Sequence, residues 1–386
     1  MQTIFSRVFL VALTWFVAVS AQASQVIIPA PPQLASTAYL LLDADTGKVL
    51  VENNADQQLP PASLTKMMTA YIVFSEISRG NLQEDDLVDV SVKAWRMGGS
   101  KMFIREGTRV AVKDLLRGMI IQSGNDASVA LAEHVAGSED AFVDVMNQQA
   151  ALLGMNDTLY HNATGWPAEG HVTSARDLSL LAQALINDHP SFYKLYSEKY
   201  FKYNGINQPN RNKLLFRDKS VDGIKTGHTD EAGFCLVSSA KKNGMRLIAV
   251  VMGTRSEAAR AAESQKLLTY GFRFYQTRTV YAGGEELDSS RVWAGQTNQV
   301  SLGIENDLLL TIPRGAEKQL QASMLVDEVI KAPVPVGKVL GELEIRLGEE
   351  VVAKQPLVAL NAVEQAGFFA RLWDAIKLFF SQMFAG

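Results

Sequence analysis

The sequence contains one cysteine, Cys235, and only five histidines among its 386 residues. A single thiol excludes an intramolecular disulfide, so apolar cores must hold the fold together. The strand-like neighbours Phe234 and Leu236 predict a buried, inert thiol rather than a nucleophile. Neither an H-E-x-x-H nor a C-x-x-C motif occurs, which argues against a zinc site. We therefore expect no metal and no cofactor.

The chain also lacks an excess of basic residues. It carries 37 Lys and Arg against 41 Asp and Glu, which gives a formal net charge of −4. Because nucleic-acid binding favours a basic surface, we predict no nucleic-acid partner. With 47% hydrophobic and 20% charged residues, the composition fits a globular protein large enough for more than one core.

The N-terminus has the order of a secretory signal peptide. Arg7 precedes an apolar run at 8–19, and an A-x-A site ends at Ala23. An uncleaved anchor is the alternative, although the run is short for a membrane span. We predict a signal peptide at 1–23 and an exported mature chain that starts near Ser24.

The segment Ser63-Leu64-Thr65-Lys66 is the first candidate for chemistry. It follows Pro60 and Pro61 at the start of a predicted helix that is apolar on nearly every side, as an interior helix is. Residues three apart share a helix face, so the Lys66 amine can reach the Ser63 hydroxyl. A desolvated lysine has a lowered pKa and can accept the proton of a serine nucleophile. An isolated S-x-x-K is more often a capping serine beside a solvent-exposed lysine, so other residues must decide.

Two more polar segments follow. Gln122-Ser123-Gly124-Asn125 lies between helices predicted at 114–121 and 126–135. A glycine between small polar residues breaks a helix and lets their side chains point into a cleft. The third segment, Lys225-Thr226-Gly227-His228, precedes a strand predicted at 233–238.

The order of the expected elements predicts the architecture. Early strands at 38–42 and 49–52 precede a helical block, which includes helices at 141–153 and 175–187. Late strands at 233–238 and 246–252 and a helix at 256–271 follow. This order predicts an α/β or α+β domain, at 24–275, whose sheet joins both ends of the segment.

Two further parts follow that domain. Short alternating runs between turn residues predict a small all-β sandwich at 276–361. In the tail, 362–386, large apolar residues such as Phe369, Trp373 and Phe380 recur at helical spacing. Charges interrupt the tail, so it suits the plane of a membrane interface better than a span. We predict an amphipathic anchoring helix; packing onto the β domain is the alternative.

Together, Ser63-x-x-Lys66, Ser123-Gly124-Asn125 and Lys225-Thr226-Gly227 resemble the signature of penicillin-binding proteins and class A β-lactamases. With its β domain and tail, the chain resembles a low-molecular-mass penicillin-binding protein of the serine D-alanyl-D-alanine carboxypeptidase type. The resemblance implies a β-lactamase/transpeptidase-like domain in which helices flank an antiparallel sheet. It implies removal of the terminal D-alanine from peptidoglycan stem pentapeptides, acylation by β-lactam antibiotics, and a peripheral location on the periplasmic face of the inner membrane.

The resemblance also implies roles for the catalytic residues. Ser63 would be the acylated nucleophile, Lys66 its proton acceptor, and Ser123 a relay of a proton to the leaving amine. Asn125 would hold the substrate amide. Backbone N–H groups of Ser63 and His228 are expected to bind the oxyanion.

The substrate's terminal carboxylate needs cations nearby. By resemblance, Lys225, Thr226, Gly227 and His228 would line the carboxylate end of the cleft, and two lysines in one pocket would lower each other's pKa. Arg260 resembles the arginine that binds this carboxylate; a solvated helix arginine is the alternative.

One departure separates branches of the family. Gly124 stands where many β-lactamases and transpeptidases carry aspartate, and we find no Glu-x-x-Leu-Asn segment to supply a deacylating glutamate. Penicillin is therefore expected to acylate Ser63 and leave slowly. A D,D-endopeptidase, a weak β-lactamase and a non-catalytic penicillin-binding wall protein stay open as alternatives. A pure binding module would not need the Lys66 amine beside Ser63 on a buried helix.

Overall fold

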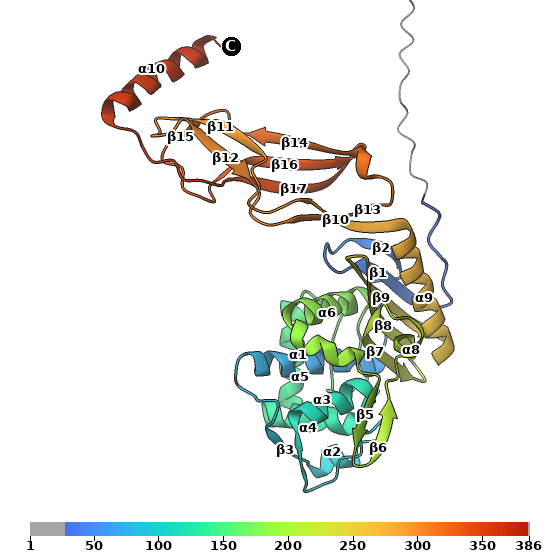
Figure 1. Cartoon of the computed structure of the whole chain (residues 1–386). Coiled ribbons are helices and arrows are strands. Elements are labelled where there is room, and N and C mark those ends of the chain that lie inside the picture. Colours follow the sequence, from blue (N-terminus) through green and yellow to red (C-terminus); the bar gives the residue numbers. More distant parts are fainter. Residues whose placement is uncertain (1–27, 385–386) are drawn as a thin grey trace, which may run out of the picture.

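The computed structural model describes residues 28–384 of the chain (Figure 1). The signal peptide predicted at 1–23 lies outside the described residues. Figure 1 shows three parts in chain order: a mixed α/β domain, a β-rich domain beyond it, and a helix near the C-terminus. The α/β domain and this last helix lie at opposite ends of an elongated molecule.

A five-stranded antiparallel sheet forms the centre of the α/β domain, with strand order β2-β1-β9-β8-β7. The strands are β1 (Ala38–Asp43), β2 (Val49–Asn53), β7 (Val221–Thr229), β8 (Gly233–Lys242) and β9 (Met245–Thr254). Strand β1 pairs with β9, with Leu40 opposite Val250. The prediction that one sheet joins both ends of this segment is confirmed.

Helices cover both faces of the sheet (Figure 1). On one face, Leu267 and Leu268 of α9 (Glu257–Phe274) form a buried cluster with Leu41 and Leu247 of the sheet. The main helices of the other face are α1 (Lys66–Ser78), α3 (Val112–Ile121), α4 (Asn125–Ala136), α5 (Glu139–Leu152) and α6 (Ala175–Asp188). In α1, every residue from Lys66 to Phe74 is buried, as expected of a helix without a polar face.

The helix predicted from Ser63 begins with a 3₁₀ turn, η1 (Ala62–Thr65), which leads directly into α1. Several other short elements were not expected from the sequence. They are β3 (Leu87–Asp89), α2 (Val92–Arg96), β4 (Arg109–Ala111), α7 (Pro190–Tyr193), η2 (Lys194–Ser197), β5 (Tyr200–Tyr203), β6 (Ile206–Pro209) and α8 (Leu214–Arg217). Each is too short for side-chain periodicity to reveal, because a periodic pattern needs a longer window.

The junction of α3 and α4 differs from the expectation in one respect. The sequence predicts a break at this place and attributes it to Gly124. In the structure Ser123 has a φ of 65°, in the left-handed region that non-glycine residues seldom enter, whereas Gly124 has a φ of −59°. Glycine is needed there for space: a Cβ on Gly124 would lie 2.9 Å from Asp126 Oδ1 and 3.2 Å from the Met102 nitrogen.

The β-rich domain begins with β10 (Tyr275–Tyr281), which pairs with β13 (Leu308–Pro313). A six-stranded sheet, in the order β14-β16-β17-β12-β11-β15, comprises β11 (Asp288–Trp293), β12 (Gln299–Gly303), β14 (Leu320–Val326), β15 (Ile330–Lys331), β16 (Val339–Leu347) and β17 (Glu350–Ala359). The short helix η3 (Glu317–Gln319) precedes β14. Leu310 and Ile312 of β13 share a buried cluster with Leu343 and Leu357 of the larger sheet. The expected all-β domain is confirmed.

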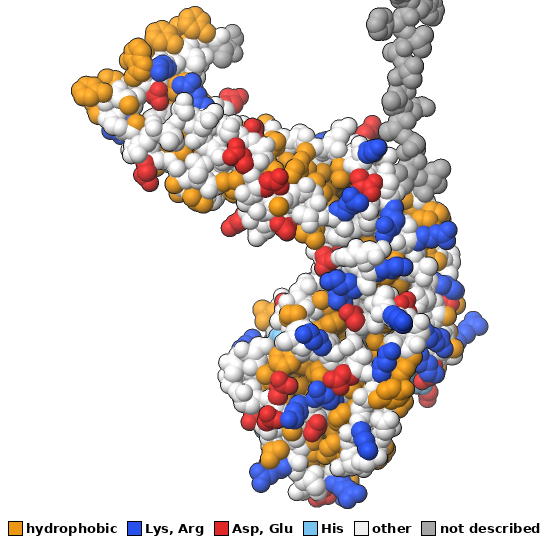
Figure 2. Space-filling model, viewed as in Figure 1, with side chains coloured by type: hydrophobic (Ala, Val, Ile, Leu, Met, Phe, Trp, Pro, Cys, Tyr) orange, Lys and Arg blue, Asp and Glu red, His pale blue; other side chains and the backbone are white. Residues whose placement is uncertain are grey.

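The last helix, α10 (Phe368–Phe384), touches the β domain with a polar residue. Asp374 Oδ2 accepts a hydrogen bond of 3.0 Å from the Ala294 nitrogen. Most of the large apolar side chains stay in solvent; Phe369 is 83% and Phe379 63% exposed (Figure 2). The structure therefore does not show the apolar side of α10 packed onto the β domain. Within residues 28–384, none of the helices combines the length and apolar character needed to cross a membrane.

Candidate active site

The residues predicted to carry chemistry come together where η1, the α3–α4 junction and β7 meet. Two hollows of 430 and 130 Å³ lie there, and Ser63, Ser100, Arg211 and His228 line both of them. We call the pair the cleft. The rest of its lining is Gly99, Ser123, Asn125, Thr164, Gly165, Trp166, Pro167, Thr226, Gly227, Thr229, Asp230, Phe234, Glu257 and Arg260.

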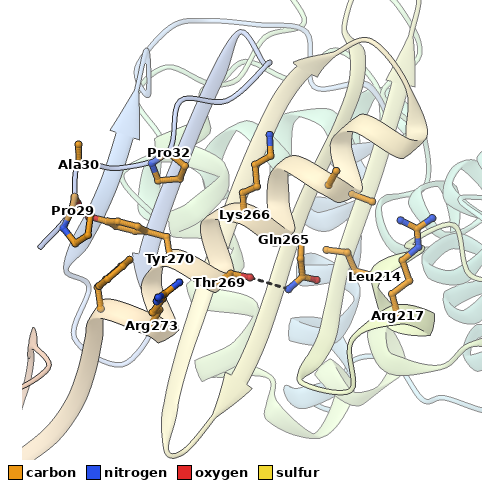
Figure 3. A pocket seen from close by; sticks show the side chains of 13 residues that line it. Pro29, Ala30, Pro32, Leu214, Arg217, Gln265, Lys266, Thr269, Tyr270 and Arg273 are labelled. Atoms are coloured by element: carbon orange, nitrogen blue, oxygen red, sulfur yellow. Dashed lines mark hydrogen bonds between the residues drawn. The ribbon is translucent and has the colours of Figure 1, made fainter.

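A larger hollow of 690 Å³ lies outside the cleft (Figure 3). It runs along the outer side of α9, between Pro29 and Pro32 of the N-terminal segment and Leu214 and Arg217 of α8. None of the site residues predicted from the sequence lines it. The largest of these three hollows is therefore not the candidate active site. The cleft is the candidate because the predicted polar side chains converge there.

The Lys66 amine is buried beside the Ser63 hydroxyl. Ser63 lies on the 3₁₀ turn η1 and Lys66 is the first residue of α1; Lys66 Nζ is 3.0 Å from Ser63 Oγ. Nζ also contacts Asn125 Oδ1 at 2.7 Å and the Thr164 carbonyl oxygen at 2.5 Å. Burial first, and then the positive charge of Arg211, lower the pKa of Lys66 to about 7, against an opposing effect of Asp126. A large share of this amine is therefore neutral near pH 7 and can accept a proton.

A second lysine and serine face this pair. Lys225 Nζ of β7 donates hydrogen bonds to Ser123 Oγ at 2.8 Å and to the Thr226 carbonyl oxygen at 3.0 Å. Burial and then the charge of Lys66 hold the pKa of Lys225 well below its usual value. The expected lowering of a lysine pKa by the other lysine is thus found at Lys225. Besides burial, the pKa of Lys66 is instead lowered by the charge of Arg211.

Asn125 is engaged by the protein at both ends of its amide. Oδ1 accepts a hydrogen bond from Lys66 Nζ, and Nδ2 donates one of 2.8 Å to the Gly98 carbonyl oxygen. The side chain thereby connects the base candidate to the loop before Ser100. Its predicted contact with a substrate amide stays a prediction.

Arg260 is buried and not solvated, which removes the alternative considered for it. It is 4% exposed, and its guanidinium donates a hydrogen bond of 3.1 Å to the Gly227 carbonyl oxygen and lies over the Phe234 ring. The His228 ring also packs on Phe234, with ring centroids 3.9 Å apart. Gly227 lets β7 approach η1 closely, since a Cβ there would lie 3.0 Å from the Pro61 carbonyl oxygen.

Sequence reasoning missed several groups of the site, among them Arg211 and the Thr164 carbonyl oxygen. Arg211 lines both hollows and donates a hydrogen bond of 3.0 Å to the Gln122 carbonyl oxygen, but it lies in a segment without motif or periodicity. The Thr164 carbonyl, which contacts Lys66, belongs to the backbone, so its residue type gives no signal. Among the described residues, no group of three or more His, Cys, Asp or Glu side chains is arranged as metal ligands would be.

Comparison with known proteins assigns the family. The model of the D-alanyl-D-alanine carboxypeptidase family, Peptidase_S11, matches residues 25–256, and that of the penicillin-binding protein 5 C-terminal domain matches residues 275–365. The chain belongs to the D-alanyl-D-alanine carboxypeptidase family. Carboxypeptidase DacA of Escherichia coli K12 is 45% identical over 366 residues, which cover 93% of this chain and 91% of that protein. DacA of Haemophilus influenzae is 41% identical, covering 97% and 96%.

Solved structures of penicillin-binding proteins have the same fold as this member of the family. Penicillin-binding protein 5 of Haemophilus influenzae superposes with a TM-score of 0.83 at 40% identity, covering 87% of this chain and all of that one. Penicillin-binding protein D2 of Listeria monocytogenes, solved with ampicillin bound, has a TM-score of 0.59 at 32% identity, covering 63% of this chain and all of that one. Family and fold thus agree with the resemblance seen in the sequence.

The contact between Gly165 and the Ser63 turn generates a prediction. A Cβ on Gly165 would lie 1.7 Å from the Ala62 carbonyl oxygen and 2.9 Å from the Ser63 nitrogen, and the glycine has a φ of +78°. Gly165→Ala must displace the Ser63 turn, and misplacement by about 1 Å costs on the order of 100-fold in rate. We expect covalent labelling by a fluorescent penicillin to slow by at least this factor.

Gly154→Ala is the matched control. Gly154 has a φ of +74° with nothing within 4 Å of its would-be Cβ, so this variant carries the backbone strain without the clash. Equal labelling rates for the two variants would show that the Gly165 contact does not position the turn.

Proposed function

We propose that this D,D-carboxypeptidase removes the terminal D-alanine from peptidoglycan stem pentapeptides through an acyl-enzyme on Ser63. One observation carries the proposal: a buried amine with a pKa lowered to about 7, Lys66, lies 3.0 Å from the Ser63 hydroxyl. A serine needs such an acceptor because its own hydroxyl is a weak nucleophile at neutral pH.

In the proposed acylation, neutral Lys66 takes the proton of Ser63 as Oγ attacks the carbonyl of the penultimate D-alanine. Backbone N–H groups of Ser63 and His228 bind the oxyanion that forms. The Lys66 ammonium gives this proton up through Ser123, which is hydrogen-bonded to Lys225 and relays it to the amine of the departing D-alanine, so that Lys66 is neutral again. Water then attacks the ester as Lys66 takes its proton, and Lys66 returns that proton to Ser63 Oγ when the ester breaks, which frees the acid product and restores both residues.

The terminal carboxylate of the substrate is proposed to bind at the β7 side of the cleft. Lys225, Arg211 and Arg260 are partly or fully buried there, so little water screens their charges. Burial lowers the pKa of each of these groups, so keeping them charged costs free energy that a bound anion would offset. Thr226 and His228 complete this side of the pocket.

β-Lactam antibiotics are proposed to acylate the same serine. One relative of this chain, penicillin-binding protein D2 of Listeria monocytogenes, has been solved both with ampicillin and with cefotaxime bound. In place of aspartate the chain has Gly124, whose surroundings leave no room for a Cβ. Without a glutamate that activates water for deacylation, we expect the penicilloyl adduct to persist.

Mass spectrometry and product analysis test the function. Incubation with penicillin should add one drug mass to the peptide that contains Ser63, and a D-Ala-D-Ala pentapeptide should lose one D-alanine. Ser63→Ala should lose both reactions, whereas Ser75→Ala, which changes a serine at the far end of α1, should keep them. An adduct on another residue would disprove the assignment of Ser63. Cleavage of cross-linked dimers without pentapeptide trimming would favour the endopeptidase alternative.

The lowered pKa of Lys66 predicts a pH profile. Because the base must be neutral, the acylation rate at subsaturating penicillin should rise about tenfold per pH unit up to about pH 7 and level off above it. Arg211→Gln removes a charge that lowers the pKa of Lys66, so the rise should move to higher pH. Arg217→Gln, at an exposed cation of α8, should leave the profile in place. A profile that Arg211→Gln does not move would contradict this electrostatic role.

We also propose that the chain is exported to the periplasmic face of the inner membrane and is held there by α10. Its exposed apolar residues are Phe368, Phe369, Leu372, Trp373, Ile376, Phe379, Phe380, Met383 and Phe384. A helix this amphipathic gains free energy when its apolar side enters the lipid interface. Charges on the described helix are few, Arg371 and Lys377 against Asp374, so apolar insertion supplies most of the attraction.

Vesicle sedimentation tests the anchor. The mature chain should bind zwitterionic phospholipid vesicles, and binding should persist in 1 M salt, where a purely ionic attraction would be screened. Phe369→Ser combined with Phe379→Ser should abolish sedimentation and leave peptide hydrolysis unchanged. As a control, Lys377→Gln should still sediment. Vesicle binding that disappears in salt, or that survives the double substitution, would refute apolar anchoring.

A further inference from the structure

A buried histidine, His171, lies behind the cleft and has no part in the proposed reaction. Its ring is 4% exposed. Nε2 is 3.0 Å from Thr65 Oγ1, and Nδ1 is 3.3 Å from Asn162 Nδ2 and 3.4 Å from the His161 nitrogen. The ring thus lies between η1, which carries Ser63, and the loop that supplies the Thr164 carbonyl.

The partners of the ring fix its tautomer. Thr65 Oγ1 donates its proton to the Ala62 carbonyl oxygen at 2.9 Å, so it accepts from His171 and Nε2 carries a proton. Nδ1 faces two N–H donors, those of Asn162 and His161, so it must accept and carry no proton. The neutral Nε2–H ring is therefore the form that satisfies these contacts.

On one side, this hydrogen-bond path ends at the residue before the nucleophile. Ala62 has a φ of 47°, an unusual conformation for a residue with a Cβ, and its carbonyl accepts from Thr65. A turn in such a conformation persists where surrounding contacts hold it. The path from His171 through Thr65 to Ala62 is one such contact.

On the other side, the path reaches the loop that holds the base. Asn162 Oδ1 accepts hydrogen bonds from the backbone nitrogens of Thr164, Gly165 and Trp166, at 3.1, 2.8 and 3.0 Å. This turn presents the Thr164 carbonyl to Lys66 Nζ. One imidazole therefore contacts both structures that set the Ser63–Lys66 distance.

We propose that His171 is a positioning residue that, as the neutral Nε2–H ring, joins the Ser63 turn to the Thr164 turn and keeps nucleophile and base aligned. The inference rests on the proposed function, since it gives His171 a role only if Ser63 and Lys66 react. His171 itself touches neither substrate nor the reacting atoms.

Charges around the ring favour its neutral form. Burial, and then His161 and Lys66, lower the pKa of His171 to about 4. Glu139 of α5 is close to the same loop, but its carboxylate is taken up by the Ala163 nitrogen at 3.0 Å and by Lys93 at 2.8 Å. The ring is thus neutral, with Nδ1 free to accept, throughout the pH range in which Lys66 can act as a base.

Acylation kinetics of His171 variants test the inference. His171→Leu removes all three hydrogen bonds of the ring at similar side-chain volume. It should lower the maximal rate of acylation by a penicillin about 100-fold, with the noncovalent binding constant changed less than about threefold. Thr65→Val cuts the same path and should have a similar effect. Because both variants break one path, the double variant should be little slower than either one alone.

The matched control is His189→Leu. His189 is also buried, at 6% exposure, and its Nε2 lies 3.1 Å from Ser75 Oγ at the far end of α1. Both leucine variants should lower the Tm, but only His171→Leu should slow acylation. His171→Gln, whose amide can still donate to Thr65, should recover part of the rate.

Three results would overturn the inference: acylation by His171→Leu at the wild-type rate, equal slowing by His189→Leu, or additive effects of His171→Leu and Thr65→Val. If His171→Leu does not fold, Thr65→Val serves as the test on its own. An unchanged maximal acylation rate in Thr65→Val would contradict the proposed role of the hydrogen-bond path from His171 through Thr65 to Ala62. Ser63→Ala is assayed in parallel. Labelling that survives Ser63→Ala means that the proposed function has failed, whereas loss in Ser63→Ala with normal His171→Leu refutes only the role of His171.

Discussion

The arrangement of the site depends on one buried amine. Water would hold the Lys66 ammonium far better than an apolar helix does, so burial shifts the group toward its neutral form. Three oxygens, from Ser63, Asn125 and Thr164, lie within hydrogen-bond distance of Nζ and offset part of the lost hydration. Each oxygen comes from a different segment of the chain. The lysine thus keeps three segments together while its amine becomes a base.

Backbone approach at two glycines makes this convergence possible. At Gly165 and Gly227 a Cβ would meet the backbone of the Ser63 turn, so loop and strand can lie against it only without side chains. At Gly124 the obstacle is the Asp126 carboxylate, which accepts from the nitrogens of Met102, Phe103 and Ile104. In the sequence, Gly124 is noted only as a departure from the aspartate of many β-lactamases and transpeptidases; in the structure, the glycine has a packing reason.

The sequence predicts those parts of the site that depend on side-chain type at fixed spacing. Ser63 and Lys66 can be recognised as a pair because residues three apart lie on the same face of a helix. Ser123 can be recognised because a glycine between small polar residues predicts a break between two helices. Arg211, the Thr164 carbonyl and His171 could not be found in this way. They reach the site through the packing of loops, and a loop contact leaves no periodic pattern. The left-handed Ser123 was also missed, because local propensity assigns that conformation to glycine.

The β domain and α10 are separate from this chemistry. The residues that line the cleft lie between Ser63 and Arg260, all before the first strand of the β domain. The junction between the domains is local: Thr46 and Thr311 hydroxyls meet at 2.6 Å, and the Arg314 nitrogen donates to the Phe274 carbonyl oxygen at 2.9 Å. Figure 1 shows the β domain between the cleft-bearing domain and α10. With α10 in a lipid interface, as proposed, the β domain would set the distance between the membrane and the cleft. The C-terminal part would then decide where the reaction takes place, and the N-terminal part which reaction it is.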